Sequence, residues 1–167
     1  MTDITVIAER AGTVHNIPIQ IGMYYFDAKF DTGSSVTVVS ASVFYNGWND
    51  RELKALKALC IQKGCALREF KSASGHKING YPVYAKDVSI GETKFQLFKY
   101  YLIIDGRREM SLIGDDFIDN CRYSHEPHGD VHITAFDFDE YEAEHEASLD
   151  NEELLNLIDE LTIQATP

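Results

Sequence analysis

The feature that most constrains this sequence is a short polar turn between two apolar runs. The runs Tyr24–Phe30 and 36–39 are rich in aromatic and β-branched residues, which favours two β-strands. Asp31, Thr32 and Gly33 stand between them. A carboxylate held between buried strands needs a partner or a proton, because desolvating a charge is costly. The turn therefore has two interpretations. Asp31 is either a carboxyl group that takes part in a reaction or part of an ordinary capped turn.

Length and cysteine content set the outer limits. A chain of 167 residues fits one domain with a tail, and its apolar pattern favours a mainly β fold. No apolar run approaches the roughly 20 residues of a membrane helix, and acidic residues in segment 1–12 are atypical of a signal peptide. Cys60, Cys65 and Cys121 lack zinc-type spacing, which favours reduced thiols and a cytoplasmic location. A Cys60–Cys65 disulfide is the less favoured alternative.

The net charge of −12 is concentrated in the tail. Residues 137–167 contain eleven acidic residues and no Lys or Arg, which leaves 16 acidic against 15 basic residues in 1–136. A nearly neutral body has no basic stripe to displace counterions from a phosphate backbone. Nucleic acid is therefore not an expected partner.

The pattern along the chain predicts further elements. Residues 51–62 predict a helix with a leucine side, and Gly64 is a suitable stop. Strands are expected at 4–8, 17–21, 67–71, 77–90, 93–104 and 131–138, with a helical turn after Ser40.

The segment 72–76 joins two of the expected strands through small residues. Such a tip lacks bulk to pack, so it suits a mobile lid, although an ordinary exposed hairpin is the simpler reading. A second feature follows at 111–118, where a short apolar strand ends in Gly114 and a helix begins with Asp115 and Asp116.

Together these motifs resemble the retropepsin-like aspartic proteases. The resemblance is carried by Phe30-Asp31-Thr32-Gly33-Ser34, by the hairpin, and by Leu112-Ile113-Gly114 followed by Asp116-Phe117-Ile118. It covers about residues 12–136, while 46–64 looks like an insertion relative to the smallest viral members. It implies a mainly β, retropepsin-like acid-protease fold: a closed, barrel-like domain with a flap hairpin and short helices.

The resemblance also implies an activity and a partner. Aspartic proteases hydrolyse peptides with two carboxylates that share one proton around a water, because two like charges so close cannot both ionise. This chain has one such motif, so the second Asp31 is expected from another copy in a homodimer. The implied function is an aspartic endopeptidase acting on a protein or peptide substrate, without cofactor or metal. The alternative is an inactive dimeric module of the same fold that binds peptides.

Roles for individual residues follow from the resemblance alone. Asp31 would be the catalytic carboxylate, Thr32 would link the two loops, and Gly33 would admit the substrate backbone. Ser34 would donate a hydrogen bond to Asp31, and 131–138 would join a sheet between subunits. The remaining expected roles are support by Leu112, Ile113 and Gly114, a flap around Ser74, Gly75, His76 and Ile78, and a cleft lined by Val36, Ile78 and Ile113.

Two positions depart from the viral pattern. Viral members carry an Asp and an Arg that pair near the dimer interface, where this chain has Ser35 and Asp115. Other contacts would therefore hold the dimer.

Competing chemistry has little support in the sequence. His125, His128 and His132 lack a completing thiol for a metal site, and Asp115, Asp116 and Asp119 are explained by helix capping. The thiol of Cys60 is expected to be buried and structural rather than acidic.

The acidic tail, 137–167, is treated as separate from the protease domain, 1–136. Asp150 begins a capping pattern, and leucines from 154 to 161 recur at helical spacing, which predicts an amphipathic helix of about three turns. Docking on its own domain is favoured over docking on a partner. A sharper hypothesis is that the acidic segment covers the cleft.

Overall fold

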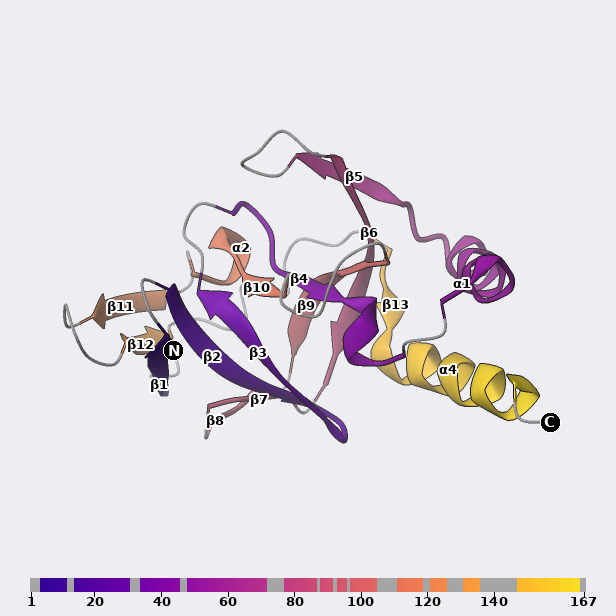
Figure 1. The fold of residues 1–167 in the computed structure, drawn as a ribbon. Helices are drawn as coiled ribbons and strands as arrows, with labels where there is room; N and C mark the ends of the chain where they lie inside the picture. Colours follow the sequence, from indigo (N-terminus) through magenta and orange to yellow (C-terminus); the bar gives the residue numbers. More distant parts are fainter. Residues whose placement is uncertain are drawn as a thin grey trace.

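The computed structural model describes residues 4–11, 14–30, 34–45, 48–71, 77–86, 88–91, 93–95, 97–104, 111–118, 121–125, 131–135 and 147–165. It confirms the mainly β class, with a mixed sheet and a few helices (Figure 1). The strands are β1 (Ile4–Ala11), β2 (Val14–Ile21), β3 (Tyr24–Phe30), β4 (Val38–Ser40), β5 (Arg68–Lys71), β6 (Lys77–Ala85), β7 (Val88–Ile90), β8 (Thr93–Phe95), β9 (Phe98–Ile103), β10 (Leu112–Ile113), β11 (Cys121–His125), β12 (Val131–Ala135) and β13 (Leu149–Asp150). The helices are the 3-10 turn η1 (Ala41–Val43), α1 (Asp50–Gln62), α2 (Asp115–Ile118) and α4 (Asn151–Ala165).

The strand order is open along the described residues. It runs β11-β12-β1-β2-β3-β10-β4-β9-β6-β13, with β5 on β6, β7 on β2 and β8 on β7. The expectation of a closed, barrel-like sheet is therefore corrected, since the two end strands of this path do not pair with each other. Figure 1 shows β11 and β12 at one end of the molecule and α1 and α4 at the other.

The β2–β3 hairpin builds one wall of the core. Ile17, Ile19 and Ile21 alternate with polar positions and are buried, which is the period of a half-buried strand. The strands meet at a turn where Gly22 has φ 60, a conformation that costs glycine little. The expected hairpin leading to Asp31 is confirmed.

Strand β12 pairs within its own chain. It forms antiparallel ladders with β1 on one edge and β11 on the other, both spanning Val131–Ala135. Both edges of β12 are therefore used within the chain, because a strand has only two edges for main-chain hydrogen bonds. The expectation that 131–138 joins a sheet between subunits stays a prediction, and such a sheet would have to continue through another strand. Residues 136–138 lie outside the described residues.

The two long ribbons expected over 67–104 are each interrupted. The ladder of β6 with β9 ends where Ala85 meets Phe98. Beyond it, β7 and β8 form a separate hairpin, and β7 pairs with β2 through Ile19 and Ile90. The prediction missed this break, which falls where Lys86 and Asp87 interrupt the apolar alternation.

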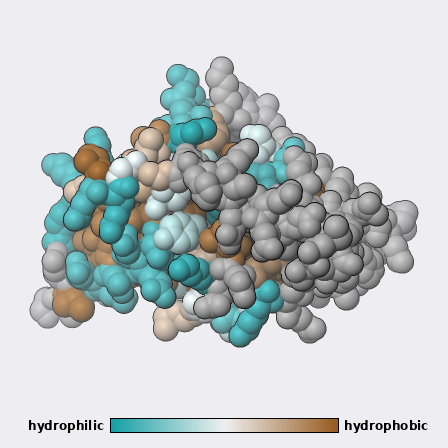
Figure 2. Space-filling view, turned by 180° about the vertical axis from the view of Figure 1, so that it is seen from behind, coloured by the Kyte–Doolittle hydropathy of each residue, from teal (hydrophilic) through white to brown (hydrophobic). Residues whose placement is uncertain are grey.

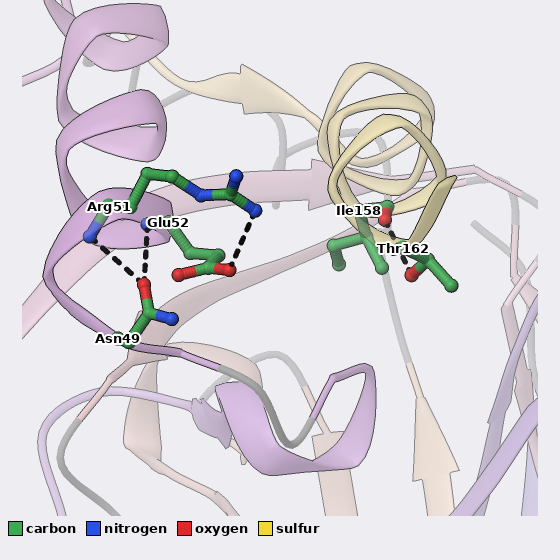
Figure 3. Close-up of polar contacts among 5 residues, drawn as sticks. All are labelled: Asn49, Arg51, Glu52, Ile158 and Thr162. Atoms are coloured by element: carbon green, nitrogen blue, oxygen red, sulfur yellow. Dashed lines mark hydrogen bonds and ion pairs between the residues drawn. The ribbon is translucent and has the colours of Figure 1, made fainter. Parts of the chain in front are cut away.

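Helix α1 confirms the prediction within one residue. Asn49 caps it, since its side-chain oxygen accepts from the amides of Arg51 (3.0 Å) and Glu52 (3.2 Å) (Figure 3). Leu56 and Cys60 face the core. Burial, with Cys65 beside it, raises the pKa of Cys60 to about 12, so the thiol is structural as expected. The alternative Cys60–Cys65 disulfide is not formed.

The C-terminal helix docks on its own chain. Strand β13 adds parallel to β6, and Asp150 caps α4 by accepting from the amide of Glu152 (2.9 Å). Leu149, Leu154 and Ile158 belong to the main core. Helix α4 packs beside α1 and β6 (Figure 1). The acidic segment of the covering hypothesis, 137–146, lies outside the described residues.

Polar residues dominate the described surface at the helical end. Seen from behind, the side that carries α1 and α4 is mainly hydrophilic, with hydrophobic residues in small separate areas (Figure 2). Among the described residues, no helix combines the length and apolar character needed to cross a membrane.

Candidate active site

The central residues of the expected site lie outside the described part of the chain. This holds for the predicted catalytic residues Asp31, Thr32 and Gly33, and for Ser74, Gly75 and His76 of the expected flap. Their flanks are described: β3 ends at Phe30, the chain resumes at Ser34, and the hairpin strands β5 and β6 are in place. The described part of the site therefore consists of the residues that hold both ends of the loop 31–33.

Strand β10 lies between the two strands that flank this loop. Ile113 pairs in parallel with Phe30, the last residue before the loop, and Leu112 pairs with Val38 after it. Ser111 extends both connections. Its carbonyl accepts from the amide of Lys29 (3.0 Å), and its hydroxyl accepts from the amide of Ser40 (3.0 Å). A segment about eighty residues downstream thus joins the two ends of the loop.

Gly114 allows the closest approach in this region. A Cβ at this position would lie 2.8 Å from the Ser34 oxygen and closer still to the carbonyl of Val36. Real Cβ atoms do not tolerate such contact with backbone, so only glycine fits. The next amide, of Asp115, donates to the Ser34 carbonyl (2.7 Å).

Thr37 and Asp116 form a polar link beside this glycine. Asp116 Oδ1 accepts from the Thr37 hydroxyl (2.6 Å), and Oδ2 accepts from the Thr37 amide (3.1 Å). The Thr37 hydroxyl in turn accepts from the Gly114 amide (3.1 Å). Burial raises the pKa of Asp116, while hydrogen bonds from Thr37 and Phe117 and the charge of Lys99 act to lower it.

Sequence reasoning missed Thr37 and assigned Asp116 only to capping. The Phe117 amide does donate to Asp116 Oδ1 (2.8 Å), so the capping interpretation is correct as far as it goes. The link to Thr37 spans 79 residues. One available signal was a polar residue, Thr37, inside the otherwise apolar run 36–39.

The hydroxyl of Ser34 has a partner within the described part of the turn. It donates to the Val36 carbonyl (2.8 Å), within the turn itself. The expected hydrogen bond from Ser34 to Asp31 stays a prediction, because Asp31 lies outside the described residues.

A second apolar cluster, separate from the main core, joins residues of β4, β9 and β10 to the hairpin strands β5 and β6. Val38, Tyr101 and Ile103 form its buried part. Phe70 of β5 packs edge-on against Tyr101, with ring centroids 4.8 Å apart. Its partly buried members are Val36, Phe70, Ile78 and Leu112.

The supporting residues of 112–114 divide between the two clusters. Leu112 packs on the second cluster, whereas Ile113 is fully buried in the main core. The expectation that Ile113 lines a cleft is therefore corrected, because successive residues of a strand face opposite sides and Leu112 takes the outer one. Val36 and Ile78, also expected there, are both in the second cluster.

No group of three or more His, Cys, Asp or Glu that could hold a metal ion occurs within the described ranges. His128 lies outside them, and for His125 and His132 the structure describes the backbone alone. The arrangement that is described can brace a loop and offer apolar contacts.

Comparison with known proteins gives matches among solved structures alone. No protein-family model and no curated protein matches the chain. Among solved structures, the chain is similar to a retropepsin-like aspartic protease from Rickettsia conorii, at 15% identity and a TM-score of 0.47. The match covers 81% of this chain and 95% of that one. At these values the likeness does not identify the function.

Proposed function

We propose that the chain is an aspartic endopeptidase in which Asp31 from each of two copies activates a water molecule. The observation that supports this most is the bracing of the loop 31–33 on both sides. Gly114 packs against the backbone of 34–36, and Asp116 accepts two hydrogen bonds from Thr37. Such rigid support is what a pair of carboxylates sharing one proton requires.

The chemistry explains why bracing matters. One carboxyl group acts as general base towards the water and the other as general acid towards the leaving amine. Their separation fixes how far their pKa values split, so a loop free to shift would lose the shared proton. In this proposal Asp31 is the reacting group, Thr32 links the two loops, and Gly33 admits the substrate backbone.

The second apolar cluster supports a peptide as substrate. Val36, Leu112 and Ile78 are only partly buried, and Ile78 belongs to a strand of the hairpin that would carry the flap. An extended peptide placed there would bury its own apolar side chains against them. Ser74, Gly75 and His76 would then close over it as the flap.

The homodimer follows from the number of catalytic carboxylates that each chain supplies. The chain has one Asp-Thr-Gly motif, and the proposed mechanism needs two carboxylates. The second Asp31 therefore comes from another copy, across a two-fold axis. The cytoplasmic location and the absence of a cofactor are part of this proposal.

The proposal keeps the reacting residues within 1–136 and assigns 137–167 as a tail. The tail still contributes to folding, because Leu149, Leu154 and Ile158 lie in the main core. We therefore expect the full chain to be the active form.

The test is peptide cleavage by the full chain, measured with a peptide library from acidic to neutral pH and alongside sedimentation. The account predicts cleavage between apolar residues, blocked by a statine-type transition-state mimic and abolished by Asp31→Asn. Peptide binding without cleavage by any form would support the alternative, an inactive peptide-binding module. Asp159→Asn, an identical chemical change at an exposed position of α4, is the matched control.

A further inference from the structure

Two cysteines meet where helix α1 ends. Cys60 lies in the last turn of α1, and Cys65 follows Gly64, whose φ of 75 turns the chain back. The amide of Cys65 donates to the carbonyl of Cys60 (2.8 Å), and the two thiol groups are themselves hydrogen-bonded. Both are free thiols in the main core. The end of the helix therefore brings two sulfur atoms into contact.

The main-chain hydrogen bond limits the distance between the two residues. With standard bond lengths on either side of it, the 2.8 Å from Cys65 N to Cys60 O keeps the two Cα atoms within about 6.7 Å of each other. A disulfide usually joins Cα atoms that are about 4.4–6.8 Å apart. The backbone is therefore already placed for a bond between the two sulfur atoms.

Contacts with the C-terminal segment support this turn. Gly64 has the left-handed conformation that other residues rarely adopt, which is common where a helix ends. A Cβ on Gly64 would lie 3.9 Å from the Cβ of Ala147. Lys63, which ends α1, pairs with Glu153 of α4 (2.8 Å). The approach of the two cysteines is thus part of the folded structure.

The two thiols differ in access. Cys65 is 8% exposed, whereas Cys60 is 1% exposed. Burial and the neighbouring Cys65 raise the pKa of Cys60 to about 12, so its thiolate is scarce at neutral pH. A small oxidant therefore reacts first at Cys65. Cys60, already in contact, is the thiol that then attacks Cys65.

We propose that Cys60 and Cys65 form an oxidation site, a dithiol that hydrogen peroxide converts to a disulfide within the folded chain. The Cys65 thiolate attacks a peroxide oxygen: the S–O bond forms, the O–O bond breaks, and hydroxide leaves and takes up the proton that Cys65 lost. The Cys60 sulfur then attacks Cys65. The S–S bond forms, the S–O bond breaks, and the oxygen leaves as water with the proton of Cys60. Two thiols and one peroxide become one disulfide and two waters.

The test is peroxide oxidation of the full chain carrying Cys121→Ser, which removes the third thiol as a competing partner. The folded protein is treated with hydrogen peroxide in buffer, and the remaining thiols are alkylated in urea. Trypsin then cuts after Lys63, between the two cysteines. We expect mass spectrometry to find the two peptides joined by a disulfide, and separate after dithiothreitol. Two cysteines that are still alkylated, or sulfinic acid at Cys65 in place of the disulfide, overturn the proposal.

Thermal unfolding of the oxidised chain tests whether the bond fits the existing turn. A disulfide that leaves the folded structure undistorted constrains only the unfolded chain, so the midpoint should rise by a few degrees. The same treatment of a chain with Cys60→Ser and Cys121→Ser should leave its midpoint unchanged. A fall in the midpoint on formation of the disulfide overturns the claim that the folded chain is already placed for it.

The order of the two steps is read with dimedone, which labels sulfenic acid. In the Cys121→Ser background, Cys60→Ser removes the attacking thiol, so peroxide should leave a labelled Cys65. Cys65→Ser is the matched variant, and in it Cys60 should stay unlabelled. Labelling of Cys60 and not of Cys65 overturns the assigned order. The oxidation of the parent chain requires no change at either cysteine, so it does not depend on whether these variants fold.

Discussion

Gly114 lies so close to Val36 that no side chain fits between them. A Cβ on Gly114 would come within 2.5 Å of the Val36 carbonyl carbon, and the obstruction is backbone that cannot rotate away. The contact joins the strand after the loop to the segment that begins α2. The packing of these two residues therefore fixes how closely the backbone of 34–36 approaches Gly114.

Replacing Gly114 by alanine should cost the fold about 3 kcal/mol or more, because the backbone of 34–36 must move. Urea unfolding of Gly114→Ala measures this cost. The matched control is Gly22→Ala, where φ is 60 but the nearest atom is the flexible end of Leu155 at 3.7 Å. That change should cost only about 1–2 kcal/mol from the left-handed backbone. Similar losses for both variants would contradict this account.

Stability should fall with rising pH through Asp116. Its native pKa is raised by burial, so the folded chain holds the proton more tightly than the unfolded chain does. The contribution is then full below the unfolded pKa of about 3.9 and is lost as the pH rises through the native pKa. The free energy of unfolding of wild type minus that of Asp116→Asn should decrease from pH 4 to pH 7. A difference that rises over this range would contradict a raised native pKa of Asp116.

Tyr100 anchors the C-terminal segment to the core. Its hydroxyl donates to the buried side-chain oxygen of Asn151 at the start of α4, and burial raises the pKa of Tyr100 well above its usual range. Tyr100→Phe leaves the Asn151 oxygen unsatisfied and should cost about 1–3 kcal/mol. Tyr84→Phe removes a longer, more exposed hydrogen bond to Asp150 (3.3 Å) and should cost less. Equal costs in urea unfolding would count against a buried anchor.

Helix α4 should be required for folding. Leu154 is fully buried, whereas Ile163 on the same helix is 73% exposed. Leu154→Ala should cost about 2–5 kcal/mol, and Ile163→Ala should be nearly neutral. Deleting 149–167 should abolish cooperative thermal unfolding. A truncated chain that still unfolds cooperatively with an unchanged midpoint would mean that the tail is only an accessory.

Cys60 should resist alkylation in the folded protein. Burial and the neighbouring Cys65 raise its pKa to about 12, so the reactive thiolate is scarce at neutral pH. Mass spectrometry after iodoacetamide treatment should find Cys60 modified in urea and protected in buffer. Rapid modification in buffer would mean that the thiol of Cys60 is not buried between α1 and the core.

The sequence predicts the local elements of this fold better than their partners. The strands around the loop and helix α1 follow from side-chain period and capping, which are local properties. The pairing of β12 with β1 and β11, the break between β6 and β7, and the link from Thr37 to Asp116 depend on contacts far apart in the chain. No local pattern encodes those contacts.

In the candidate site, too, the sequence predicts local features better than contacts between distant residues. The resemblance implied a supporting role for Gly114, but the close approach of its backbone to 34–36 was not predicted. The faces of Leu112 and Ile113 were not resolved, because in a strand of two residues alternation does not tell which one faces the core. The apolar stripe of α4 indicated burial, but the surface that buries it, β6 and α1, is set by tertiary packing.

The central claim is that two copies of Asp31 form one reacting centre, and mixing two chains tests it most directly. Wild type and Asp31→Asn are combined in varying ratios at constant total concentration, allowed to exchange, and assayed for peptide cleavage. If each centre needs both carboxylates, total activity will follow the square of the wild-type fraction. Activity that follows the wild-type fraction linearly, or cleavage by Asp31→Asn alone, would contradict the account.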